Sequence, residues 1–221
     1  ARVGLRGAGI VPWLVSRGPA TAWVAIGAGG ALLLGGDSVR LDVRVASGCT
    51  LHIEDVGGTV AYDGEGRTAT WDVRASLGDG ARLTWRALPF VVADGASVER
   101  SMSVTLGAGA SAIVRETLVL GRAGERGGTV VSRLDVTDAG GPLLVETLRV
   151  CGDAPVPGVL GTHRVVDSVL AVGAEAGGIP AVTDAPGATV LRLERGGHLV
   201  RALGTDAHVV DLAPVFDRFA G

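Results

Sequence analysis

A strand–turn–strand unit recurs about every thirty residues between residues 31 and 152. Each copy has a run of alternating apolar and polar residues, a turn centred on glycine, and a second apolar run. Repeats with this period are typical of stacked units, each of which buries its apolar face only against its neighbours. The repeat therefore predicts an all-β, stacked-strand body of the β-helix-like (solenoid) kind, and not a cleft built around a catalytic group. The copies occupy residues 41–53, 71–85, 102–114 and, more faintly, 134–145.

The alternation within the copies indicates which side chains face the core. In the first copy Leu41, Val43 and Val45 would share one face of a strand, with Asp42 and Arg44 on the other. The same reasoning across the other copies predicts a set of buried apolar residues, namely Trp71, Val73, Leu83, Val104, Ile113 and Leu118.

Both ends of the chain carry further signals, and we expect one domain over residues 1–221. Residues 1–30 favour edge strands, and residues 163–221 favour more strands followed by a short helix. Pro214 suits the first turn of that helix, which would end at Phe219. The segment 174–186, rich in glycine, alanine and proline, is typical of a loop.

Composition narrows the function classes. The net charge is −3, and although all twenty basic residues are arginine, no basic block is present, so no nucleic-acid partner is expected. The apolar run 22–34 is too short to span a membrane, and the N-terminus lacks the pattern of a secretory signal. Cys49 and Cys151 form no CxxC pair, which fits a reducing cytoplasm.

Motifs that carry catalysis are missing from the sequence. It contains no GxSxG nucleophile elbow, no Walker loop and no HExxH motif. His52 and Glu54 would alternate on one strand face, and imidazole with carboxylate suits nickel or zinc. Two ligands alone do not make a metal site, so a solvated strand face stays the alternative.

The densest polar cluster interrupts an apolar strand pattern near the middle of the chain. Glu116 precedes the apolar run 117–120, and Arg122, Glu125 and then Arg133 follow it among several glycines. Charged groups held on glycine turns are suited to partner recognition. The alternative is a salt-bridged hairpin tip that contributes little to the stability of the fold.

This cluster resembles the central signature of the urease accessory protein UreD family, called UreH in some systems. Further similar segments follow in the family's order, so the resemblance covers residues 30–220. They are residues 32–41 (LLLGGDSVRL), 80–90 (GARLTWRALPF), 115–128 (RETLVLGRAGERGG), 141–146 (GPLLVE) and 199–204 (LVRALG).

The resemblance implies a β-rich maturation factor without turnover of its own. Members bind the accessory protein UreF, which recruits the GTPase UreG, and the assembly docks on apo-urease and assists nickel insertion. The four scattered histidines and two separated cysteines gather no three ligands in the sequence, so we expect no tightly bound cofactor and at most transient Ni²⁺ at His52 and Glu54.

Partner binding is then expected through the polar turn and the C-terminal apolar residues. Those residues would either form a stripe for a helical partner or only close the end of the stack, and they are Val209, Leu212, Val215, Phe216 and Phe219. Two other readings stay open: an enzyme using Glu116, Asp37 or His52, and a β-solenoid binding module unrelated to urease.

Overall fold

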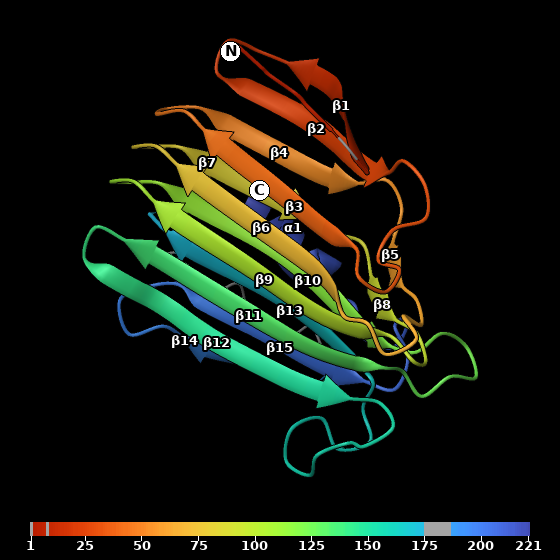
Figure 1. Cartoon of the computed structure of the whole chain (residues 1–221). Coiled ribbons are helices and arrows are strands. Elements are labelled where there is room, and N and C mark those ends of the chain that lie inside the picture. Colours follow the sequence, from red (N-terminus) through yellow and green to blue (C-terminus); the bar gives the residue numbers. More distant parts are fainter. Residues whose placement is uncertain (1, 8, 175–186) are drawn as a thin grey trace.

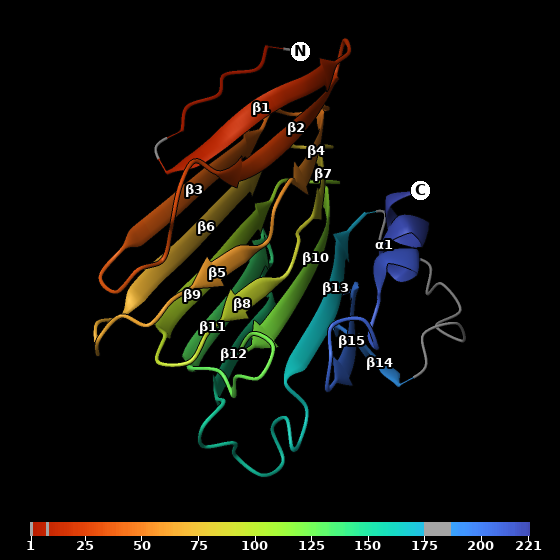
Figure 2. The same ribbon diagram turned by 90° about the vertical axis from the view of Figure 1, so that its right-hand side faces the viewer.

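The computed structural model describes residues 2–7, 9–174 and 187–221, which form two facing β-sheets and one short helix (Figures 1 and 2). The expected all-β body with a short C-terminal helix is therefore confirmed. The predicted loop 174–186 lies outside the described residues apart from Ala174.

The first sheet, sheet A, contains one strand from each coil and is extended at both ends by antiparallel strands. In spatial order its main strands are β1 (Ile10–Arg17), β2 (Thr21–Ala28), β4 (Thr50–Asp55), β7 (Arg82–Arg86), β10 (Ser111–Leu120), β13 (Val165–Gly173), β15 (His198–Gly204) and β14 (Ala188–Arg192). Two short strands join it beside β10, β5 (Thr59–Ala61) and β8 (Phe90–Val92).

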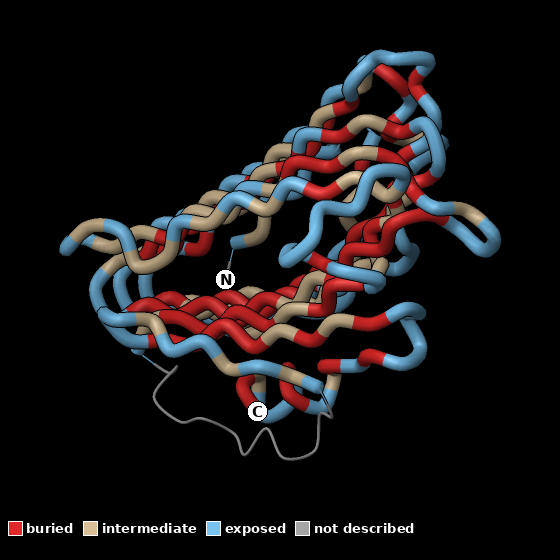
Figure 3. The backbone as a smooth tube through the Cα atoms, turned by 90° about the horizontal axis from the view of Figure 1, so that it is seen from below, coloured by how far each residue is buried: buried red, intermediate tan, exposed pale blue. Residues whose placement is uncertain are grey.

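The second sheet, sheet B, faces sheet A across the core (Figure 3). Its strands in spatial order are β12 (Gly141–Cys151), β11 (Thr129–Asp138), β9 (Ser97–Leu106), β6 (Ala69–Leu77) and β3 (Ser38–Val45). The four strands β3, β6, β9 and β11 are parallel, as stacked coils require.

The register of these parallel strands confirms the period of about thirty residues. Ser38 lies beside Thr70, and Ala69 lies beside Val98. The chain leaves sheet B for sheet A at a glycine turn in each coil, and Gly48, Gly80 and Gly109 all have positive φ there. Glycine adopts this conformation without steric cost, which explains why the turn glycine recurs.

The fourth copy differs from the other three. β11 continues the parallel stack, but β12 turns back beside it in the same sheet instead of crossing to sheet A. Asp138 causes this tight turn, because its Oδ1 accepts a hydrogen bond from the Gly140 N–H at 2.7 Å and Gly141 follows at φ 109°. The faint fourth repeat is thus a half coil closed by a hairpin.

The core lies between the sheets, and the six apolar residues predicted to be buried are all buried. Ile113 differs from the expectation in its side, because it is buried on the outer face of sheet A and not in the core between the sheets. A second apolar cluster lies on the outer face of sheet A, where the helix α1 (Ala213–Ala220) packs on β10 and β13. Strands β1 and β2 confirm the edge strands expected near the N-terminus.

Candidate functional site

The signature segment 115–128 contributes side chains to both faces of sheet A. It runs along β10 and into the following turn, so neighbouring side chains point to opposite sides of the sheet. Arg115 faces outward towards the helix, and Glu116 faces inward between the sheets.

On the outer face, Asp167 of β13 anchors the approach to α1. Its carboxylate has no exposed surface and accepts hydrogen bonds from Arg115 (2.8 Å to Nη2), the Thr117 hydroxyl (3.0 Å) and the Leu212 N–H (2.8 Å). Arg115 also contacts Asp211 at 2.8 Å. A buried carboxylate needs such a complete set of donors, so this network fixes where the helix starts.

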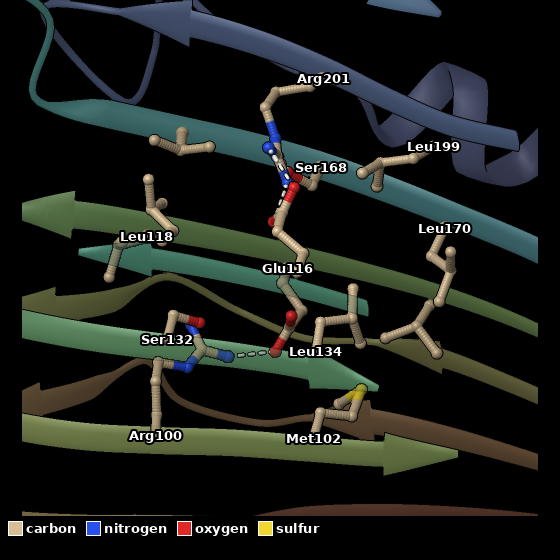
Figure 4. A pocket seen from close by; sticks show the side chains of 14 residues that line it. Arg100, Met102, Glu116, Leu118, Ser132, Leu134, Ser168, Leu170, Leu199 and Arg201 are labelled. Atoms are coloured by element: carbon tan, nitrogen blue, oxygen red, sulfur yellow. Dashed lines mark hydrogen bonds and ion pairs between the residues drawn. The ribbon is translucent and has the colours of Figure 1, made fainter. Parts of the chain in front are cut away.

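On the inner face, charged side chains bridge the two sheets (Figure 4). Glu116 of β10 forms an ion pair with Arg100 of β9, whose side chain is 8% exposed. Glu146 of β12 accepts two hydrogen bonds from Arg201 of β15, at 2.8 and 2.9 Å. Arg201 Nε also donates to the Ser168 hydroxyl at 3.1 Å.

The register explains why these groups meet. Glu116, Ser168 and Arg201 are direct neighbours across β10, β13 and β15, while Arg100 and Ser132 are neighbours across β9 and β11. The residues around them enclose a cavity of about 40 Å³, which is room for a very small number of waters. We call this group the inner polar row: Arg100, Glu116, Ser132, Glu146, Ser168 and Arg201.

A second small cavity lies on the other side of the Arg100–Glu116 pair, and Asp55 lines it. The Asp55 carboxylate accepts hydrogen bonds from Trp85 Nε1 and from the Leu88 N–H, each at 3.0 Å. Burial raises the pKa of Asp55 from its ordinary 3.8 to about 6, although these two hydrogen bonds oppose the shift. The negative charge of Glu116 raises the pKa further.

The turn after β10 is rigid and carries Arg122 at its tip. Arg122 Nε donates to Glu125 at 2.7 Å, and the Arg122 N–H donates to the other oxygen of Glu125 at 2.8 Å. These bonds hold the pKa of Glu125 down at about 2. Arg164 donates to the carbonyls of Gly121 and Arg122 at 2.7 and 2.8 Å, and these hydrogen bonds hold the turn backbone in place.

Glycine is required at Gly121 in this turn. Its φ is 74°, and a Cβ there would lie 2.8 Å from the Glu125 carbonyl oxygen. The Arg122 side chain is 56% exposed, so the turn presents a charged group in a fixed orientation. Arg133, also proposed from sequence, lies on β11 in an exposed ion pair with Glu99 at 3.6 Å.

His52 and Glu54 do lie on one face of β4, as the alternation indicates. His52 stacks on Trp23 with ring centroids 4.1 Å apart, and its Nδ1 is 2.7 Å from the Thr84 hydroxyl. Burial, followed by the charge of Arg82, lowers the pKa of His52, and the negative charge of Glu54 opposes this shift. Among the described residues no group of three or more His, Cys, Asp or Glu could hold a metal ion.

The C-terminal phenylalanines are buried by this chain itself. Phe216 and Phe219 pack with Val215 against sheet A, whereas Val209 is 63% exposed. The sequence left open a stripe for a helical partner or closure of the end of the stack, but these residues cover the outer face of sheet A at β10 and β13, away from either end of the stack. Arg86 supports the helix by contacting Asp217 and lying 5.1 Å over the Phe216 ring.

Several residues of this site were not identified from sequence: Asp55, Arg100, Glu146, Asp167, Ser168 and Arg201. The three residues considered for an enzyme are not gathered together. Glu116 faces the space between the sheets, and His52 lies on the outer face of sheet A. Asp37 accepts the Leu34 N–H in the turn before β3. No helix in the described part of the chain has the length and apolar character needed to cross a bilayer.

The fold and the site together define a short β-solenoid with a helix on the outer face of sheet A, which offers rigid polar surfaces and no gathered catalytic group among its described residues. The sequence profile of the family described as UreD urease accessory protein matches residues 13–214. The chain therefore belongs to the UreD urease accessory protein family.

Individual relatives agree with this assignment. The chain is 47% identical over 150 residues to "Urease accessory protein UreD 1" of Streptomyces griseus, covering 67% of this chain and 59% of that protein. It is 38% identical over 195 residues to the UreD of Frankia alni, covering 79% and 65%, respectively. The UreD of Streptomyces coelicolor is 33% identical over 224 residues, covering 95% and 85%. The chain thus spans less than two thirds of the length of the first two relatives.

Proposed function

We propose that this protein is a non-enzymatic urease maturation factor that binds UreF, and through it the GTPase UreG, and presents them to apo-urease for nickel insertion. The observation that carries the proposal is the family match over residues 13–214. The relatives are named as urease accessory proteins. A cytoplasmic location is part of the proposal.

We assign direct partner contact to the rigid turn and its neighbourhood. Arg122 is exposed and Glu125 is locked to it, so a partner carboxylate can pair with Arg122 at little cost in side-chain entropy. Arg133 adds a second exposed cation on β11. Glu116, Phe216 and Phe219 are not assigned direct contact, because Glu116 faces the space between the sheets and the two phenylalanines pack under α1 on the outer face of sheet A.

Capture of UreF tests this assignment. The Arg122→Glu, Glu125→Arg double variant keeps an ion pair within the turn but reverses its exposed charge. We expect it to retain the parent's circular dichroism spectrum and to capture UreF at least tenfold more weakly. Arg149→Glu, which makes the same arginine-to-glutamate change at an exposed position of β12, is the control for reversal of the exposed charge. Equal capture by the parent and the double variant would exclude the turn as the contact.

Urease activation tests the function as a whole. A urease operon whose UreD gene is deleted should regain urease activity when this chain is expressed together with UreF and UreG. The chain alone should hydrolyse neither urea nor GTP. Full complexes with UreF and apo-urease but no gain in urease activity would contradict the maturation role.

We propose that Ni²⁺ is cargo here and is bound weakly and transiently. His52 and Glu54 are the pair to test, since they share one face of β4. Titration calorimetry of the parent and of the His52→Ala, Glu54→Ala double variant measures this directly. Submicromolar Ni²⁺ binding by the parent would contradict the proposal, and its loss in the double variant would place the metal on β4.

A further inference from the structure

At the β3 end of the stack, the two sheets differ in extent among the described residues. Sheet A continues past β4 with β2 and β1, whereas sheet B ends at β3. β2 pairs with β4 in parallel, with Thr21 beside Thr50, so it occupies the place of a sheet A strand in a preceding coil. Among the described residues, that coil has no strand in sheet B (Figure 2).

A groove of about 430 Å³ occupies the place of the missing strand. Its floor is apolar and comes from one face of β2, through Ala22, Val24 and Ile26. Its two sides are the N-terminal segment 2–7 and β3. Every residue from 40 to 46 lines the groove, and because successive side chains of a strand alternate between faces, it is the backbone edge of β3 that borders it.

Free strand edges offer unpaired N–H and C=O groups to any extended peptide that fits beside them. An added strand would point every second side chain onto the apolar floor. The remaining side chains would lie beside the outward-facing residues of β3, which include Arg40 and Arg44, and near Arg2 and Arg6 of the N-terminal segment. Arg40 already pairs with Asp72 of β6 at 3.1 Å, whereas Arg44 forms no ion pair with any described residue. Asp42 is the one acidic residue among the described residues that line the groove.

The positive charges along the groove therefore favour an acidic peptide as its occupant. An alternating apolar and acidic strand would place carboxylates beside the arginines, and opposite charges on neighbouring strands stabilise pairing. A second copy of this chain fits poorly, since antiparallel pairing of two β3 strands about Asp42 would set Asp42 against Asp42 and Arg40 against Arg44. Like charges directly opposite one another destabilise a strand pair.

We propose that the groove along β3 is a peptide-binding site that takes an extended, alternating apolar–acidic strand of a partner protein as the next strand of sheet B. This site is separate from the turn at Arg122 and does not depend on the urease function. A peptide there would complete the coil that β2 begins.

A synthetic heptapeptide of alternating valine and glutamate, labelled with fluorescein, tests the proposal by anisotropy with the whole chain. We expect saturable binding, and at least tenfold weaker binding of the peptide with lysine in place of glutamate. Arg44→Glu should weaken binding of the glutamate peptide at least tenfold, and Arg149→Glu should leave it unchanged. Equal binding of both peptides would overturn the charge argument.

Backbone pairing is tested on the peptide, so that the fold of the protein is left intact. Two further glutamate peptides carry N-methyl groups on alternate amides, one on each edge of the strand. At least one of them should fail to bind. If both bind like the parent peptide, the site does not add a strand, and the proposal is wrong. Binding of decanoate with no binding of any peptide would identify a small-amphiphile site instead and would equally overturn it.

Discussion

The space between the two sheets is apolar in the first coils and polar in the last, although the same repeat position lines both. Val39, Trp71, Arg100 and Ser132 are register neighbours across β3, β6, β9 and β11. The first two pack in the core, and the last two belong to the inner polar row. The backbone repeat thus continues while the chemistry of its side chains changes.

The difference teaches what the repeat controls. Stacking and the glycine turns set the strand spacing, which any inward side chain of suitable size can use. Charged residues are tolerated towards the β12 end because each has a partner and because the region is partly open, with Arg201 22% and Glu146 28% exposed. A charge in the apolar part would have neither a partner nor water.

The sharpest way to break this comparison is to put a charge in the apolar part. Val104 lies on β9 like Arg100, but outside the inner polar row and in the apolar core, where it is 1% exposed. Val104→Asp should abolish soluble expression, because an unpaired buried charge costs several kcal/mol against a total stability of about 5–15 kcal/mol. The adjacent Thr105→Asp, at an exposed position, should express and melt like the parent. Soluble Val104→Asp with a parental melting temperature would refute the core assignment.

Within the polar part, removing one charge of an ion pair should lower the free energy of unfolding by less than Val104→Asp does, but still by a large amount. Glu116→Gln leaves the buried guanidinium of Arg100 without its counter-charge, although Arg100 keeps its contact with the Phe90 ring at 4.9 Å. Breaking a buried pair costs about 3–5 kcal/mol, and partial exposure of Glu116 reduces the expectation to about 2–3 kcal/mol. Urea unfolding measures this loss.

A double variant of Arg100 and Glu116 separates the effect of an unpaired charge from the effect of side-chain packing. Replacing both partners, as Arg100→Met with Glu116→Gln, removes the unpaired charge and should recover part of the lost stability. If the double variant is as unstable as the sum of the two single variants, the charges of Arg100 and Glu116 do not stabilise one another.

Asp55 marks the boundary between the two parts, and its titration should be visible in the stability. Because the pKa of Asp55 is raised from 3.8 to about 6, the folded protein holds a proton that the unfolded chain has lost. The free energy of unfolding should therefore fall as pH rises from about 4 to 6, by about 2 kcal/mol after allowing for partial exposure.

Asp55→Asn should flatten this pH profile, since the uncharged amide does not titrate. Asp42→Asn removes an exposed carboxylate of β3 and should keep the slope of the parent. Urea unfolding at about pH 4, 5 and 6.5, which covers the window of about 4 to 6, compares the three proteins. A parental slope in Asp55→Asn would assign the pH dependence to other groups.

The sequence contains the signals for the coils but not for their ends. The period-2 alternation and the turn glycines depend on local geometry, and they predicted the strands and the buried set correctly. The direction of β12 was not predictable in this way, because its alternation is like that of a crossing strand and only the Asp138 turn sends it back. The burial of Phe216 and Phe219 likewise depends on where α1 docks on sheet A.

The inner polar row was predictable only in part. Arg100 stands among inward apolar residues of β9, and this break in the alternation was a usable signal. Its partner Glu116 was identified, but as a member of a polar cluster and not as an inward residue. Arg201 and Glu146 come together from strands on different sheets, so no local pattern in the sequence joins them.

The smallest expected effect lies outside both parts, on the outer face of sheet B. Arg133 and Glu99 form an exposed pair at 3.6 Å, with side chains 46% and 55% exposed. Such pairs contribute about 0–1 kcal/mol, because water screens the charges and two long side chains must be ordered. Arg133→Ala should therefore unfold within about 0.5 kcal/mol of the parent in urea, far below the loss in Glu116→Gln. Comparable losses in the two variants would mean that exposure does not separate the outer charges from the inner polar row, and the contrast between inside and outside would fail.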